Sequence, residues 1–100
     1  MKNITIGETY TFKLTSGEEV VGKVTGVEDH LISLKDPVSV APGPQGLGLI
    51  QSMFTADPKD PARLNINNVT IYALTDDSVK AKYIEATTGL VVPDKKLILG

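Results

Sequence analysis

The chain contains no cysteine and no tryptophan, and His30 is the single histidine among its 100 residues. The absence of cysteine excludes disulfide bonds, a thiol nucleophile and any metal site built on thiolates. One histidine gives no local nucleophile–base–acid arrangement, and the carboxylates show no paired spacing beyond solvated runs such as Glu18-Glu19. We therefore expect a protein that is not an enzyme and that holds neither a metal ion nor another cofactor.

Long apolar runs are also missing from the sequence. No stretch approaches the roughly 18–20 residues that cross a bilayer, and residues 1–4 lead into polar alternation without the apolar region of a signal peptide. These features predict a cytoplasmic protein. The formal net charge of −2 argues against a surface that binds phosphate everywhere, but a local group of cations could still bind nucleic acid.

Short segments with a period near two dominate the first three quarters of the chain. In residues 9–15, Tyr10, Phe12 and Leu14 alternate with polar residues, which is typical of a half-buried strand. The same reasoning predicts four further strands, at residues 20–27, 31–35, 47–55 and 69–74. Asp36-Pro37 is expected to end the third of these strands, and residues 37–48, rich in proline and glycine, are expected to form a loop. Residues 64–68 ("LNINN") fit either a strand or a tight corner.

The apolar period changes after residue 75. Val79, Tyr83 and Ile84 fall on one face of a helix predicted over residues 76–87, with Thr75 or Asp76 as its N-cap. Gly89 is a plausible end for this helix. The following segment, "LVVPDKKLIL", is interpreted as either a short hairpin arm or a docking tail.

Two glycines inside the second predicted strand, Gly22 and Gly26, indicate where it bends, because glycine inside a strand often marks a barrel corner. The fold class that follows is mostly β: a small, strongly bent, five-stranded barrel with a C-terminal helix. We expect one domain over residues 1–100, with the barrel at about 7–75, the helix at about 76–87 and a tail at 88–100.

Residues 20–36 resemble the first motif of the Sm/LSm family, the Sm-like proteins that include bacterial Hfq and short phage-encoded members. Val20, Gly22 and Val24 match its apolar-x-Gly-x-apolar part, and His30 falls on its aromatic position. The second motif of the family resembles "LNINNVTIYAL". There Asn67-Asn68-Val69 matches the Asn-Asn-apolar part, and Asn65 stands at the arginine position.

The resemblance implies a closed homo-oligomeric ring of roughly five to seven subunits, in which the fourth predicted strand of one subunit pairs with the fifth of the next. It also implies nucleic-acid binding, with single-stranded RNA as the expected partner, and a role in RNA or DNA processing. His30 would stack on a base, Asn67 and Asn68 would present amides to bases, and Asn65 would be a further contact because it stands at the arginine position. Each also has a simpler interpretation: His30 as an exposed corner residue beside Asp29, and the asparagines as ordinary turn residues. The alternative function is a scaffold ring that binds only protein.

Overall fold

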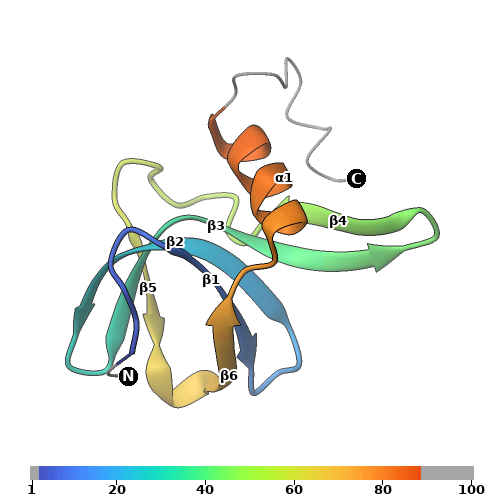
Figure 1. Ribbon diagram of the computed structural model, residues 1–100. Helices are drawn as coiled ribbons and strands as arrows, with labels where there is room; N and C mark the ends of the chain where they lie inside the picture. Colours follow the sequence, from blue (N-terminus) through green and yellow to red (C-terminus); the bar gives the residue numbers. More distant parts are fainter. Residues whose placement is uncertain (1–2, 89–100) are drawn as a thin grey trace.

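The computed structural model describes residues 3–88, and Figure 1 shows an antiparallel sheet with one helix at its upper end. Eight elements follow one another along the chain. They are β1 (Thr9–Leu14), β2 (Glu19–Glu28), β3 (Leu31–Gly43), β4 (Gly46–Gln51), β5 (Ala62–Asn65), the 3-10 helix η1 (Ile66–Asn68), β6 (Val69–Leu74) and α1 (Asp77–Thr88). The predicted mostly β fold with a C-terminal helix is confirmed.

The sheet is built around the long strand β3. Its strand order is β4-β3-β2-β1-β6, and all pairs are antiparallel. Two strands share the edge of β3 that faces away from β2: residues 31–34 pair with β5, and residues 38–43 pair with β4. The second half of β3 and β4 thus form a hairpin that projects from the rest of the sheet (Figure 1).

An irregularity at Asp36-Pro37 separates the two halves of β3. Val21 pairs with Val38 and Lys23 with Lys35, so Gly22 alone faces the two residues Asp36 and Pro37. Asp36 has a φ of 49°, and proline, which has no N–H to donate, is tolerated in a strand at such a bulge. A β-bulge bends its strand and increases the local twist. The bulge lies between the residues of β3 that pair with β5 and those that pair with β4.

Gly22 is required at this point because the two strands approach closely. A Cβ atom at position 22 would lie 3.3 Å from the Cβ of Leu34, which is tighter than most contacts between side chains. Gly22 thus stands at an irregularity of the β2–β3 pairing where its missing side chain is needed. Gly26 stands at a second register shift of β2, where the space for a side chain is less restricted.

Tyr83 of α1 spans the strand pair beside the bulge. Its hydroxyl donates to the carbonyl oxygen of Lys35 at 2.6 Å and accepts from the backbone N–H of Lys23 at 3.1 Å. Burial raises the pKa of Tyr83 to about 12, so the hydroxyl keeps its proton and can donate at neutral pH. The helix is thereby tied to β2 and β3 at the position where their ladder is irregular.

Two clusters of buried side chains lie on opposite faces of the sheet. The first takes residues from β1, β2, β3, β5, η1 and β6 and is centred on Phe12, Val24 and Ile32. The second lies under α1, where Tyr83 and Ala86 pack against Val21, Val38 and Leu49. Val20 and Val21 are neighbours in β2 but belong to different clusters, because side chains alternate between the faces of a strand.

Several predicted boundaries are wrong. Asp36-Pro37 does not end the third strand, and residues 37–48 are not a loop but the end of β3, a tight turn and the start of β4. The fourth predicted strand, 47–55, ends at Gln51, and a sixth strand, β5, takes up the four residues "ARLN" before η1. Proline and glycine content misled the prediction because the bulge and the hairpin turn use both residues inside a paired region.

The C-terminal helix lies close to its predicted position. Asp76 is the N-cap: its carboxylate accepts the backbone N–H groups of Ser78 and Val79 at 3.0 and 3.3 Å. Hydrogen bonds from Ser78 and from the Val79 and Ser78 backbones lower the pKa of Asp76. Tyr83 packs on the sheet as expected, whereas Ile84 is exposed and does not share its face. Gly89 and the "LVVPDKKLIL" segment lie outside the described residues.

The Tyr83 bridge can be tested by Tyr83→Phe, which keeps the ring and removes the hydroxyl. We expect the free energy of unfolding to fall by about 1–3 kcal/mol, because the Lys23 N–H and the Lys35 carbonyl lose a shared partner. Urea denaturation followed by circular dichroism measures the change. Tyr72→Phe in β6 is the matched control, since it removes a tyrosine hydroxyl that takes no part in the bridge. Equal effects of the two substitutions would contradict the account.

Candidate nucleic-acid interface

The turn between β2 and β3 lies against η1 at one end of the sheet (Figure 1). Asp29 occupies the left-handed region with a φ of 54°, and this conformation turns the chain sharply before His30. Leu31 pairs with Asn65, and the backbone N–H of Ile66 donates to the carbonyl oxygen of His30 at 2.9 Å. The backbone thus joins the two predicted motifs at one corner.

Asn65 has a structural role at this corner. Its side-chain oxygen accepts the backbone N–H of Asn67 at 2.9 Å, so Asn65 is the N-cap of η1. The carbonyl oxygen of Asn68 accepts the N–H of Thr15 at 2.8 Å, which attaches η1 to the turn after β1. The interpretation of Asn65 and its neighbours as turn residues therefore has direct support.

All four predicted site residues are exposed at this corner: His30, Asn65, Asn67 and Asn68. We name these residues the corner cluster. The histidine ring and the asparagine side chains come from segments more than 30 positions apart in the sequence, and the Leu31–Asn65 register brings them to one end of the sheet. An exposed ring can stack on a base, and amides can bond to base edges. The cluster therefore has the chemical groups that base recognition needs.

Carboxylates border the corner cluster. Glu28 and Asp29 directly precede His30, and both are exposed. Several cations of the described residues are paired in other places: Lys13 with Glu19 at 3.8 Å, Arg63 with Asp60 at 3.2 Å, and Lys80 with Glu8 at 3.7 Å. Negative charge beside the ring disfavours phosphate. Any nucleic acid bound here would be held mainly through its bases.

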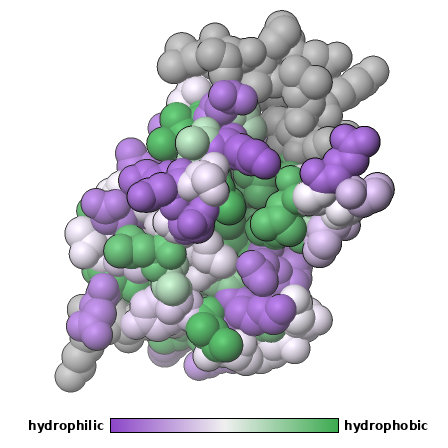
Figure 2. Space-filling view, turned by 45° about the vertical axis from the view of Figure 1, so that its right-hand side comes forward, coloured by the Kyte–Doolittle hydropathy of each residue, from purple (hydrophilic) through white to green (hydrophobic). Residues whose placement is uncertain are grey.

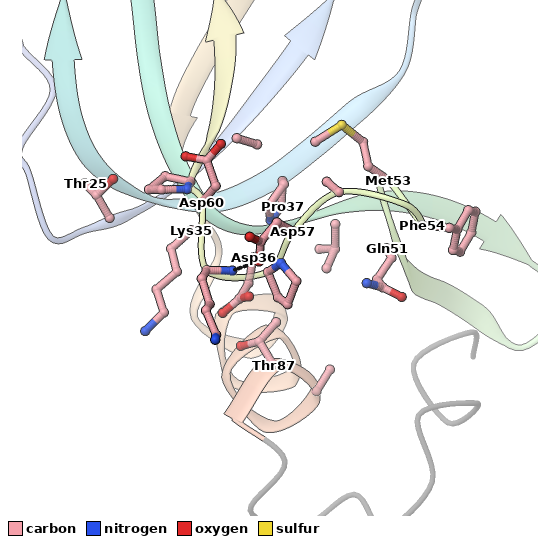
Figure 3. Close-up of a pocket in the computed structure, with 17 residues that line it drawn as sticks. Thr25, Lys35, Asp36, Pro37, Gln51, Met53, Phe54, Asp57, Asp60 and Thr87 are labelled. Atoms are coloured by element: carbon pink, nitrogen blue, oxygen red, sulfur yellow. Dashed lines mark hydrogen bonds between the residues drawn. The ribbon is translucent and has the colours of Figure 1, made fainter.

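Sequence reasoning missed a pocket at the opposite end of β5. It has a volume of about 690 Å³ and lies between the bend of β3, the loop after β4 and the end of α1 (Figure 3). Among its lining residues are Asp36, Met53, Phe54, Asp57, Asp60 and Thr87. The predicted extension of the fourth strand to residue 55 hid it, because Met53 and Phe54 were assigned to that strand. Met53 is 46% exposed and Phe54 is 70% exposed, and the apolar pattern of the sequence did not predict this exposure.

The two strands that flank η1 each pair on one side only within residues 3–88. β5 pairs with β3, β6 pairs with β1, and no ladder joins β5 to β6 in this part of the chain. On β6, Ile71 is 66% exposed and Leu74 is 63% exposed. Figure 2 shows hydrophobic side chains gathered on the visible face and surrounded by polar ones. An unpaired edge with apolar side chains is a ready site for strand pairing.

No protein-family model matches the chain, and no curated protein matches it in sequence. Within residues 3–88, neither helix has the length and apolar character needed to cross a membrane. Side chains of His, Asp and Glu in the same residues form no group of three that could hold a metal ion. Function must therefore be argued from the fold and its surfaces.

The capping role of Asn65 predicts a stability change that a purely ligand-binding residue would not produce. Asn65→Ala should lower the free energy of unfolding by about 0.5–2 kcal/mol, because the Asn67 N–H loses its acceptor, whereas Asn65→Asp retains an acceptor. Asn67→Ala is the control, since its side chain is exposed. Thermal or urea unfolding measures all three variants. A stable Asn65→Ala protein would show that the cap contributes nothing.

Proposed function

We propose that this chain is an Sm-like ring subunit that binds single-stranded RNA through the corner cluster. The observation that carries the proposal is the convergence of His30 with Asn65, Asn67 and Asn68 at one exposed corner, through the Leu31–Asn65 pairing. These residues were selected from two separate motifs in the sequence. Their proximity is what a shared binding site requires.

The proposed fold is a strongly bent five-stranded barrel made by β1, β2, the first half of β3, β5 and β6. Support comes from the first buried cluster, to which these strands and η1 all contribute side chains. Tyr10, Phe12 and Tyr72 lie together in it, with ring centroids 6.2–6.4 Å apart. On this proposal the second half of β3 and β4 are an arm outside the barrel.

Ring assembly would pair β5 of one subunit with β6 of the next. The sequence suggested residues 47–55 as the first of these edges, but the strand that precedes the Asn-Asn corner is β5. A head-to-tail interface uses two different edges of the same molecule and either closes into a ring or grows into a filament. The single-sided pairing of β5 and β6 supplies two such edges, and Ile71 and Leu74 supply apolar surface.

The ring makes a testable prediction about oligomeric state. Light scattering should find a discrete oligomer of roughly five to seven subunits. Replacing Ile71→Asp and Leu74→Asp together should dissociate it, because the interface would bury unpaired carboxylates. Ile6→Asp changes another exposed apolar residue (61% exposed) and should leave the oligomer intact. A monomeric wild-type protein at micromolar concentration would overturn the ring.

RNA binding is tested through the ring of His30. Fluorescence anisotropy with short U-rich and A-rich single strands should show that His30→Ala weakens binding by about 1–3 kcal/mol per stacked base. His30→Phe should preserve or strengthen binding, since stacking needs a ring face and not a proton. Salt should weaken binding only slightly, because few cations neutralise phosphates at this corner. Full binding by His30→Ala would exclude His30 as a contact.

The carboxylates of Glu28 and Asp29 beside His30 favour a second candidate function, a scaffold ring that binds only protein. They would repel phosphates that approach the ring of His30. An intact oligomer that binds neither the U-rich nor the A-rich strand at low salt would support this alternative. It would overturn the proposed RNA binding. In that case the asparagines of the corner cluster would serve only the fold of η1.

A further inference from the structure

The pocket beside α1 takes no part in the proposed RNA site, and it shares only Ala62 with the proposed ring edges. Its lining combines exposed apolar side chains, Met53 and Phe54, with the carboxylates of Asp36, Asp57 and Asp60 and the ammonium groups of Lys35 and Lys59. Three carboxylates against two ammonium groups give the lining a small excess of negative charge. The volume of about 690 Å³ is within the range of pockets that bind a small ligand, so part of a chain segment can enter it.

The chain itself contains a segment with matching chemistry. Residues 89–100 read GLVVPDKKLILG, with two aliphatic triplets at 90–92 and 97–99 separated by Pro93-Asp94-Lys95-Lys96. The aliphatic triplets would cover apolar surface, which stabilises by roughly 25 cal/mol per Å² removed from water. The two lysines against one aspartate give the segment the opposite excess charge to the pocket.

The segment also begins at the right place. α1 ends at Thr88, and Thr87 is one of the residues that line the pocket. In Figure 3 the end of α1 lies on one side of the pocket, and Met53 and Phe54 come from the loop that follows β4. An extended chain covers about 3.3 Å per residue. Because the pocket begins at Thr87, residues 90–99 are long enough to reach every part of it.

We infer that the C-terminal segment, residues 90–99, binds in the pocket of its own chain. Its aliphatic triplets contact Met53 and Phe54, and Lys95 and Lys96 face Asp57 and Asp60. Asp60 keeps its ion pair with Arg63, which lies outside the pocket lining. This inference is independent of the proposed RNA binding and explains why the two large apolar side chains of the loop after β4 face outward.

Cysteine cross-linking tests the inference directly, because the native chain has no cysteine. Phe54→Cys is combined with Leu97→Cys or, in a second variant, with Val91→Cys, one from each aliphatic triplet. A disulfide forms only where the two Cβ atoms can approach to about 3.5–4.5 Å. Mild oxidation of the full-length protein should give an intrachain disulfide in at least one variant, seen by mass spectrometry and as a monomer on a non-reducing gel.

Matched controls separate docking from random collision. Asn67→Cys replaces Phe54→Cys in the control pairs. Asn67 is also exposed, but it follows the far end of β5, whereas Ala62 at the near end lines the pocket. Lys95→Glu with Lys96→Glu should slow the Phe54 cross-link several-fold at low salt, whereas Lys23→Glu with Lys82→Glu should not. Equal cross-linking at Phe54 and Asn67 would overturn the inference. A disulfide found only between two chains would also overturn it and assign the pocket to the segment of a second copy.

Discussion

The bulge of β3 at Asp36-Pro37 lies where β2, β3 and α1 meet. Two residues of β3 face the single residue Gly22, and the close approach of Leu34 leaves no room for a larger residue there without displacement. Tyr83 bridges Lys23 and Lys35 beside this point and so connects α1 to the bend. On either side of this point β3 has a different neighbour, β5 along residues 31–34 and β4 along residues 38–43.

The bulge also separates the corner cluster from the arm formed by β4. Before it, β3 carries β5 and brings Asn65 to the corner beside His30; after it, β3 carries β4 as an arm. The pocket lies where the two halves diverge, and Asp36 and Pro37 form part of its lining. Base recognition at the corner cluster and docking of the C-terminal segment would therefore lie at opposite ends of β5, whose edge is proposed to pair between copies.

Local patterns predicted much of this fold, and tertiary context decided the remainder. Alternation located β1 and β6, and the glycine at position 22 indicated the bend. The pattern failed at Asp36-Pro37, because a proline that ends a regular strand is accepted at a bulge. Residues of the corner cluster could be chosen from motif spacing, but the capping role of Asn65 depends on the 3-10 turn that follows it. The pocket was beyond prediction, since its lining joins β2, β3, a loop and α1.

We propose that β5 and β6, which each pair on one side only within residues 3–88, pair with each other between copies. Amide hydrogen exchange, measured residue by residue at a high and a low protein concentration, tests it most directly. The account predicts that the amides of β5 and β6 that point away from β3 and β1 are protected at high concentration and lose protection together on dilution, while β1 and β2 remain protected. Rapid exchange of those outward amides at both concentrations, with the rest of the sheet protected, would contradict the claim.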